Sequence, residues 1–300
     1  MKKVRPEDGL IFDFNKEHQP ILTVESGSTV EIETCDCFEN QIESPETVVS
    51  EMDWNRVNPA TGPIFLKDAE PGDILKVKIE KLEIGEQGVM VVGPGLGVMG
   101  HKIKEMEAKI IPIREGMAHF DNLQLPLTPM IGVMGVAPKG EGINCGTPGS
   151  HGGNMDTTLI KEGATVYFPV FTEGALFATG DFHAAMGDGE ISVSGVEIKG
   201  KVTVTLEVIK GESISHPYIE NEEVAGAIVS AETLDEAVKL GTEDIVTRIS
   251  EKTGRSIPNV TMLMSAVGQA QVSQVVDPLV TARFVVPQGL LQQLGVRLIG

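Results

Sequence analysis

The chain is poor in aromatic residues and in positive charge. Among its 300 residues are one Trp and two Tyr, so the exposed rings on which sugars stack are scarce. Lys and Arg number 24 against 43 Asp and Glu, which gives a net charge of −19. An acidic surface of this kind repels phosphate backbones and anionic lipid, so nucleic acids and membrane surfaces are poor partners. A small neutral or cationic molecule, or a divalent metal ion, suits this charge better.

Long apolar runs and paired cysteines are also missing. No stretch of eighteen apolar residues occurs, so no membrane-spanning helix is expected. The N-terminal MKKVRPEDGL carries basic residues with no apolar segment behind them, and it does not read as a signal peptide. The cysteines are odd in number (Cys35, Cys37 and Cys145), and the first two are too close along one predicted strand to form a disulfide readily. We therefore expect reduced thiols and a cytoplasmic protein.

Glycine and proline are plentiful, and they separate segments with a β pattern. Three segments place a glycine turn before alternating apolar residues: VESGSTVEIET (24–34), EPGDILKVKIEKLEI (70–84) and KEGATVYFPVF (161–171). The stretch SVSGVEIKGKVTVTLEVIK (192–210) predicts a hairpin that turns at Lys199-Gly200. Short alternating strands with glycine turns predict an antiparallel sandwich or barrel.

The pattern changes near residue 215. SAETLDEAVKLGTEDIVTRISEKTG (230–254) predicts a helix that Ser230 or Thr233 caps and Gly254 ends, with a weak point at Gly241. Two strands, 260–276 and 280–287, and a short amphipathic GLLQQLG turn are expected to follow.

The predicted fold is mainly β with α+β additions, arranged in three parts. A jelly-roll-like β-sandwich or barrel body comprises residues 1–87 and 150–214. A Gly/Pro-rich β subdomain comprises residues 88–149, and a long irregular segment of this kind inside a compact fold is usually functional rather than a linker. An α+β region (215–300) packs as a layer against the body.

Two glycine motifs do not carry a nucleotide site. GLGVMG (95–100) matches the dinucleotide pattern, but its neighbours favour strands rather than the βαβ unit that this pattern needs. GVEIKGKV (195–202) resembles a phosphate-binding loop, yet Val202 stands where the metal-binding Ser or Thr belongs. Thiol catalysis is also disfavoured, since Cys35 and Cys37 flank an acid rather than a base.

Asp36 is an acid that the strand pattern places on a buried face. In VEIETCDCF (30–38), strand alternation places Asp36 on the apolar face with Val30 and Ile32. An unpaired buried carboxylate costs several kcal/mol, so Asp36 must be paired, hydrogen-bonded or bound to a metal ion. Two interpretations remain: a metal ligand, or an acid at the end of a strand that accepts hydrogen bonds from turn amides.

The stretch GDFHAAMGDGE (180–190) places Asp181 and His183 two residues apart, on one side of a predicted strand. Oxygen and imidazole together suit Zn²⁺, Mn²⁺ or Fe²⁺. A Gly-Asp-Gly turn could fold Glu190 back over this pair, whereas Asp188 is expected to belong to the turn alone. The alternative is a solvated acidic turn beside a core histidine.

Two further loops hold candidate residues. In SHGGNMDT (150–157), the amides of Gly152 and Gly153 could approach a ligand, and Asn154 could donate a hydrogen bond; a tight structural turn is the alternative. Glu141, between two glycines, reads by itself as a solvated loop acid. The histidines without a partner at chelating spacing (His18, His101, His119 and His216) are expected to be structural or exposed.

Taken in order, six segments resemble the metal-dependent acetamidase/formamidase family. They are LTVESGSTVEIETCDCFENQI, NPATGPI, PMIGVMGVAP, HGGNMDT, GALFATGDFHAAMGDGE and SQVVDP, which together span most of residues 20–280. The resemblance implies hydrolysis of short primary amides such as formamide and acetamide to ammonia and a carboxylate. It also implies a β-rich, partly jelly-roll fold, a small neutral amide as partner, and an oligomer, most simply a homodimer.

The resemblance further implies zinc, with room for a second divalent ion such as calcium. It assigns metal ligation to Asp36, Asp181 and His183, with Glu190 next. It makes Glu141 a candidate ligand or base and Asn154 a candidate for substrate binding. In the resulting hypothesis, Glu190 or Glu141 moves a proton from a metal-activated water to the leaving nitrogen, while Asn154, Gly152 and Gly153 hold the amide.

Two other function classes compete with this hypothesis. A cupin-like or non-haem metal oxygenase uses similar strands, but such sites usually want two histidines, and the spacing here offers Asp-x-His alone. A non-enzymatic metal- or carbohydrate-binding β module would use the acids for a structural ion. It predicts exposed aromatic rings, of which Trp54 and two tyrosines are a small supply.

Overall fold

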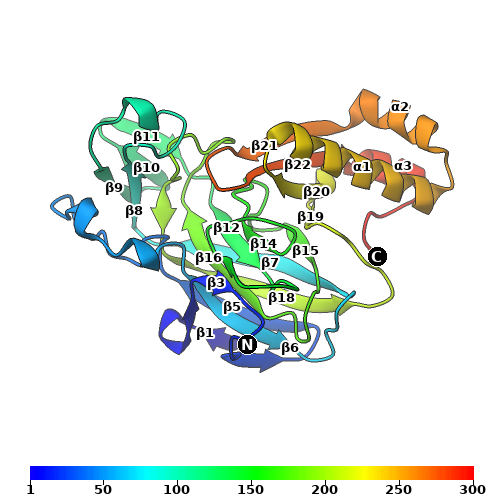
Figure 1. Ribbon diagram of the computed structural model, residues 1–300, viewed down its shortest axis with the longest axis horizontal. Coiled ribbons are helices and arrows are strands. Elements are labelled where there is room, and N and C mark those ends of the chain that lie inside the picture. Colours follow the sequence, from blue (N-terminus) through cyan, green and yellow to red (C-terminus); the bar gives the residue numbers. More distant parts are fainter.

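The computed structural model describes all 300 residues as two large β-sheets, with three helices at one end (Figure 1). The first sheet has nine strands in the order β1 (Lys2–Val4), β5 (Ser28–Thr34), β18 (Gly200–Ile209), β7 (Ile74–Ile84), β15 (Thr165–Pro169), β19 (Tyr218–Glu220), β20 (Val224–Ala231), β22 (Val280–Pro287) and β21 (Gln269–Gln274). Only the β1–β5 pair in it is parallel.

The second sheet has eleven strands and contains the centre of the molecule. Its main path runs through β11 (Leu123–Pro126), β10 (Met117–Phe120), β9 (Glu107–Arg114), β8 (Gln87–Val92), β17 (Glu197–Ile198), β16 (Phe177–His183), β12 (Met130–Gly135) and β14 (Gly152–Asn154). A branch strand, β6 (Ala60–Leu66), pairs with β16, β2 (Leu10–Ile11) and β4 (Leu22–Val24).

The remaining elements are short. β3 (Asp13–Phe14) pairs with β13 (Ile143–Asn144) as a separate ribbon. Four single-turn 3₁₀ helices cover Pro6–Asp8, Val49–Glu51, Trp54–Arg56 and Gly100–Lys102.

The two sheets share one apolar core of 34 buried residues, which includes Val30 and Ile32 from one sheet and Ile131, Phe177 and Phe182 from the other. In β7, ILKVKIEKLEI, most of the alternate apolar residues are buried, as a strand with one face on a core requires. The strands predicted from the three glycine-turn segments are confirmed, as is the mainly β fold class.

The predicted hairpin at Lys199-Gly200 is wrong. β17 and β18 lie in different sheets: Glu197 pairs with Val89 and His183, while Gly200 pairs with Thr34 and Ile84. Lys199 is therefore the point where the chain crosses from one sheet to the other. Alternation predicts a strand and its faces, but it carries no information about which strand will be the neighbour.

The C-terminal helix α1 (Leu234–Thr253) confirms the predicted one. The Thr233 hydroxyl accepts a hydrogen bond from the amide of Glu236, and Gly254 ends the helix in a left-handed conformation. The helix continues through Gly241, which is buried under Val229 and Phe284. Packing on β20 and β22 thus outweighs the low helix propensity of glycine.

The strand predicted for residues 260–276 is only half right. Ser256 caps a helix, α2 (Ile257–Val267), and strand β21 begins after Gly268. Pro258 in the first turn and the serine cap are helix-start signals that the apolar run VTMLM concealed. The last helix, α3 (Gln288–Leu294), falls on the predicted GLLQQLG turn.

The C-terminal layer is continuous with the body. β19 pairs with β15, so the first sheet extends without a break beneath the helices (Figure 1). A second core of 20 buried residues lies between this extension and the helices. All three cysteines are buried and unpaired, and no helix combines the length and apolarity needed to cross a membrane.

Candidate metal centre

His183 occupies the last position of β16, between two neighbouring strands of the second sheet. It stands opposite Met130 of β12 on one side and opposite Glu197 of β17 on the other. Side chains opposite each other on antiparallel strands lie side by side. Nε2 of His183 is accordingly 3.1 Å from Oε2 of Glu197.

Three more acids converge on the same nitrogen. Nε2 of His183 lies 3.4 Å from Oδ1 of Asp181, 3.8 Å from Oδ1 of Asp156 and 3.9 Å from Oε1 of Glu190. His183 and the four acids are all buried, and Asp156 has no exposed surface. We call these five residues the acid–histidine cluster.

Much of this cluster has no hydrogen-bond partner within the protein. The unpartnered atoms are both carboxylate oxygens of Asp156, Oδ1 of Asp181, Oε2 of Glu197 and both ring nitrogens of His183. An unpartnered buried carboxylate costs several kcal/mol. One imidazole cannot balance four carboxylates, so the cluster fits a bound cation.

The pKa values of these acids are shifted by the same excess of buried carboxylates. Burial raises the pKa of Glu190 to about 8 and that of Glu197 to about 8, although the charge of His183 opposes both shifts. Burial also raises the pKa of Asp156 well above its ordinary value. For Asp181, burial acts in the same direction, but the nearby charge of His183 outweighs it and lowers the pKa. A divalent cation would remove the need to neutralise these acids with protons.

The donor atoms form two groups, in each of which the atoms lie within 4.8 Å of one another. One group comprises Asp156, His183 and Glu190, and the other comprises Cys37, Asp181 and Glu197. Imidazole with carboxylates is a zinc, manganese or iron(II) donor set. The thiol of the second group suits zinc and does not suit calcium, which takes oxygen ligands.

Two glycines make room for this cluster. A Cβ atom on Gly132 of β12 would lie 2.3 Å from Oδ2 of Asp181 and 2.4 Å from Oδ1 of Asp156. A Cβ atom on Gly195 would lie 2.6 Å from Nδ1 of His183. The backbone at both positions thus fits closely against the donor side chains.

Three of the acids also have unusual backbone conformations. Asp156 (φ 40°), Asp181 (φ 55°) and Glu190 (φ 47°) all lie in the left-handed region. Non-glycine residues in this region cost of order 1–3 kcal/mol each, and they concentrate at functional sites. The fold therefore holds these three side chains in place against a local preference.

Asp36 accepts hydrogen bonds from turn amides, as the second of its two interpretations expected. β5 ends at Thr34, and Oδ1 of Asp36 accepts hydrogen bonds from the amides of Phe38 (3.0 Å) and Asn40 (2.8 Å). Burial raises the pKa of Asp36, and the turn amides oppose that shift. Its carboxylate belongs to neither of the two groups of converging donor atoms, and metal ligation by Asp36 stays a prediction.

The Gly-Gly segment has a packing role. The amide of Gly152 donates to the carbonyl of Gly149, so it is not free for a ligand. Side chains at Gly152 and Gly153 would collide with the carbonyls of Met134 and Thr147. Both glycines are needed because β14 lies so close to its neighbours.

Asn154 is buried at the edge of the cluster, but it is oriented differently from our expectation. Its amide nitrogen donates to Oδ2 of Asp277 (3.1 Å), and its Oδ1 has no partner. Asn154 therefore presents an acceptor, where the sequence suggested a donor. Burial raises the pKa of Asp277 well above its ordinary value, with Asp156 and Asp181 adding to the shift.

Glu141 lies outside the cluster. Its side chain is exposed in the loop between β12 and β13, and it makes no ion pair or hydrogen bond in the chain. Of the other histidines, His18 pairs with Asp13 at 2.8 Å. The expectation that Glu141 lines the site is thus not supported.

Sequence reasoning missed three acids of this site: Asp156, Glu197 and Asp277. Asp156 stood inside the quoted segment HGGNMDT, and Glu197 was assigned to a hairpin that does not exist. Glu197 reaches His183 because β17 pairs with β16, Asp156 follows β14, and Asp277 is joined to the site through Asn154. A signal was nevertheless present for Asp156, as an acid directly after a buried glycine-rich segment.

The loop that carries Glu190 is fastened to the C-terminal layer. Asp188 accepts two hydrogen bonds from the guanidinium of Arg283 on β22, at 3.1 and 2.6 Å. The amide of Gly189 donates to the carbonyl of Ser273, and the amide of Val275 donates to that of Gly189. The same Arg283 also donates to Gln271, Val272 and Ser273.

This arrangement predicts a large cost for Arg283→Met. Arg283 is 4% exposed, and its loss takes a donor from Asp188, Gln271, Val272 and the buried Ser273. We expect the free energy of unfolding to fall by about 3 kcal/mol, measured by urea denaturation.

Arg297→Met is the matched control, because the Arg297 side chain is 67% exposed and its ion pair with Glu220 spans 3.5 Å. It should change stability by less than about 0.5 kcal/mol. Equal effects of the two changes would refute the fastening role.

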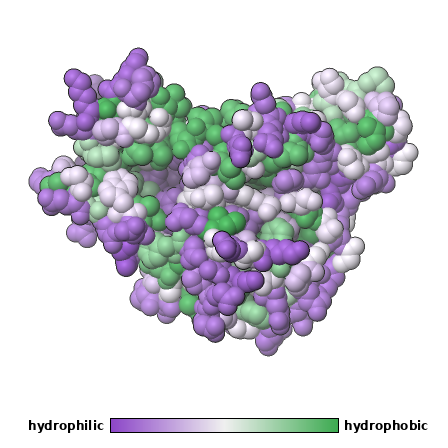
Figure 2. All heavy atoms as spheres, in the orientation of Figure 1, coloured by the Kyte–Doolittle hydropathy of each residue, from purple (hydrophilic) through white to green (hydrophobic).

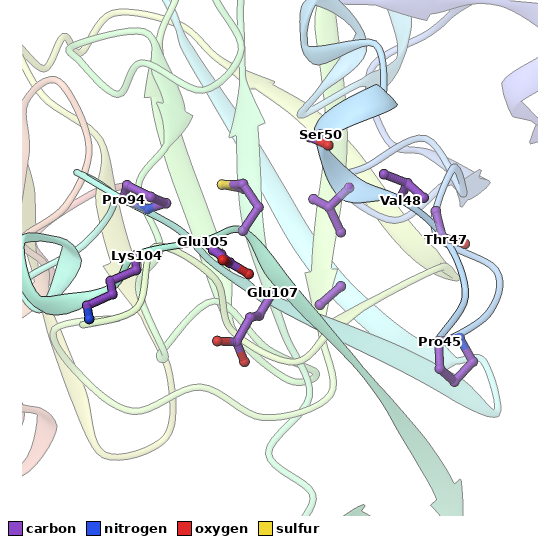
Figure 3. A pocket seen from close by; sticks show the side chains of 11 residues that line it. Pro45, Thr47, Val48, Ser50, Pro94, Lys104, Glu105 and Glu107 are labelled. Carbon is purple, nitrogen blue, oxygen red and sulfur yellow. The ribbon is translucent and has the colours of Figure 1, made fainter.

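A cavity of about 680 Å³ lies elsewhere (Figure 3). Pro45, Thr47 and Val48 line one side, and Glu105 and Glu107 line the other. None of its lining residues belongs to the acid–histidine cluster. A second cavity, of about 570 Å³, does reach Glu190.

Known proteins share both the sequence pattern and the fold. The acetamidase/formamidase family model matches residues 13–144 and 139–288. A protein described as a predicted acetamidase/formamidase, from Thermoanaerobacter tengcongensis, is 54% identical with a TM-score of 0.97, covering 99% of this chain and 98% of that one. An acetamidase from Bacillus halodurans is 46% identical with a TM-score of 0.95, covering 98% and 100%.

Curated relatives are more distant in sequence. A formamidase from Methylophilus methylotrophus is 25% identical over 270 residues, which cover 70% of this chain and 66% of that protein. The chain thus spans a little under two thirds of the length of this relative.

Proposed function

Because the chain belongs to the acetamidase/formamidase family, we propose that it hydrolyses short-chain primary amides, such as formamide and acetamide, to ammonia and a carboxylate. One observation carries the proposal of a metal-dependent reaction. Four buried acids converge on Nε2 of His183, and much of their hydrogen-bonding capacity is unused.

The proposed ligands of the first metal ion are His183, Asp156, Glu190 and, from the neighbouring group, Asp181. Zinc suits this mixture of imidazole and carboxylate. When bound, it supplies a Lewis acid that polarises the amide carbonyl and makes water acidic enough to ionise near neutral pH. If a second divalent ion binds, Cys37, Asp181 and Glu197 are the donors that favour zinc over calcium.

Glu190 is the proposed proton carrier. It is the only acid of the cluster that also lines the cavity from which a substrate can approach. From that place its carboxylate can accept a proton from the attacking water and deliver it to the leaving nitrogen, which must depart as neutral ammonia. Glu141 has no such position, so the choice between the two acids falls on Glu190.

Asn154 has a positioning role in this proposal. Oε2 of Glu197 lies 3.1 Å from Nε2 of His183, beside the proposed ligand atom. Oδ1 of Asn154 can accept a hydrogen bond from the amide N–H of the substrate, since its own nitrogen is held by Asp277. A neutral amide meets no charge barrier at this acidic surface.

The competing functions lack support in the site. A cupin-like oxygenase would place a second histidine beside the metal, but the cluster contains His183 alone. Of the few aromatic residues that could stack on a sugar, Trp54 is exposed on a 3₁₀ helix, and both tyrosines are buried.

Metal removal tests the proposal directly. We expect the purified protein to release ammonia from formamide and acetamide, and a chelator followed by desalting to abolish this release. Stoichiometric zinc should restore it, with elemental analysis reporting metal per chain. Hydrolysis that persists at full rate in metal-free protein would refute the metal mechanism while leaving the amidase assignment intact.

A further inference from the structure

The cavity that reaches Glu190 is far larger than acetamide requires. It measures about 570 Å³, within the range of roughly 300–1,000 Å³ in which proteins hold drug-sized ligands. It lies between the strands β8, β10 and β11 and the loop that follows β16. In Figure 2, apolar side chains gather along the upper edge of the molecule, between the lobe of β9–β11 and the centre.

Most of the exposed surface of the cavity wall is apolar, and apolar side chains contribute to it from both sides. Met90, Phe120 and Leu125 come from the strands, and Met186, Ile191 and Val196 come from the loop and its continuation. Met90, Phe120 and Leu125 also pack against the main core, which fixes this side of the wall. The ring of Phe120 is held in addition by Lys109, whose Nζ lies 4.6 Å from the ring centroid.

The cavity ends at the acid–histidine cluster. Glu190 belongs to both, and its carboxylate joins this mostly apolar space to the cluster. Gly195 also lines the cavity, and its backbone lies directly against the imidazole of His183. A molecule that fills the cavity therefore places one end next to the proposed reaction centre.

Most polar side chains in the wall already have partners. The Ser194 hydroxyl bonds to the amide and carbonyl of Val91, and the Ser192 hydroxyl donates to the carbonyl of Ser194. Asp188 accepts hydrogen bonds from Arg283 and Thr158. No lysine or arginine lines the cavity. The wall thus offers little to a polar or anionic substituent and much to an apolar one.

From this geometry we propose that the substrates include primary amides with a larger apolar acyl group, aliphatic or aromatic, that lies in this cavity. The inference rests on the proposed amidase function and names its substrate class. The carboxamide is placed at the cluster, and the acyl group extends between Phe120 and Ile191. Formamide and acetamide are too small to fill the cavity. They therefore lack the favourable free energy that a longer acyl group gains when it moves from water into the cavity.

A substrate series tests this inference by ammonia release. We expect kcat/KM to rise about fourfold for each methylene from acetamide to butyramide and hexanamide. Phenylacetamide should exceed acetamide by about tenfold to a hundredfold, whereas succinamate, which carries a carboxylate on its acyl chain, should not exceed it. If formamide and acetamide are hydrolysed but kcat/KM falls with chain length, the inference is wrong and the proposed function survives. If no amide is hydrolysed, the proposed function itself fails.

Variants of the wall then locate the effect. Phe120→Ala should lower the ratio of kcat/KM for phenylacetamide to that for acetamide by at least about tenfold. Ile191→Asp should lower the ratio as well, and Ile191 is 59% exposed, so this change spares the fold. Leu123→Ala is the control: Leu123 is 55% exposed on the same hairpin but lies outside the cavity, and the ratio should not change. A ratio that neither wall variant alters would place the acyl group elsewhere and overturn the inference.

Discussion

Replacing His183 with alanine is expected to remove the bound metal ion and to lower kcat/KM for acetamide by about a thousandfold or more. Nε2 of His183 is the atom on which all four buried acids converge, so no other nitrogen of the cluster can take its place. Without the ion, the reaction loses both the polarised carbonyl and the acidified water. Elemental analysis and ammonia release measure the two losses in the same preparation.

The matched control is His101→Ala. His101 is exposed on a 3₁₀ helix and lies outside the cluster, so metal content and rate should stay at the level of the unchanged protein. Circular dichroism on both variants separates a lost site from a lost fold. A His183→Ala protein that keeps its metal and turns over within about threefold of the original rate would mean that the ion is held elsewhere.

Gly132→Ala adds a single methyl group, and we expect it to lower both the reaction rate and the metal affinity strongly. The new methyl group would lie 2.3 Å from Oδ2 of Asp181 and 2.4 Å from Oδ1 of Asp156, so both acids must move. A displacement of this order at a reaction centre can cost about a hundredfold in rate. We expect kcat/KM and metal affinity to fall by at least that factor. Stability should fall by about 1–3 kcal/mol, as overpacking usually costs.

Gly140→Ala is the control for this change. Gly140 lies in the loop after β12, and a Cβ atom there would meet nothing within 4 Å. Rate, metal content and the free energy of unfolding should therefore be unaffected. Should Gly132→Ala also keep its rate, the two acids would not need the positions that they occupy, and their role as ligands would be refuted.

The loop that carries Glu190 shows how the C-terminal layer contributes to the site. Arg283 fixes Asp188, and β21 fixes Gly189, so the body and the layer meet next to the proposed proton carrier. Asn154 and Asp277 form a second link of the same kind. The layer thus closes one side of the site in addition to burying its own core.

Local patterns in the sequence were enough for several features of this protein. Period-two alternation after glycine turns predicted β5, β7 and β15, because a strand with one face on a core must alternate. Thr233 and Gly254 marked the ends of α1, since free amides and carbonyls at helix ends require such residues. The Asp-x-His spacing placed Asp181 and His183 together, and the structure has them 3.4 Å apart. The family resemblance also came from the sequence alone.

Tertiary structure decided the rest, because pairing between distant strands depends on packing that no local pattern records. Strand pairing places β17 in the second sheet, so that Glu197 lies beside His183, 14 positions away along the chain. The tertiary structure made Asp36 the acceptor of turn amides and left Glu141 in solvent. It brought Asp156 to the same nitrogen from the edge of β14. The sequence determined that an acid and a histidine would share one side of a strand, and the sheet determined which other acids would join them.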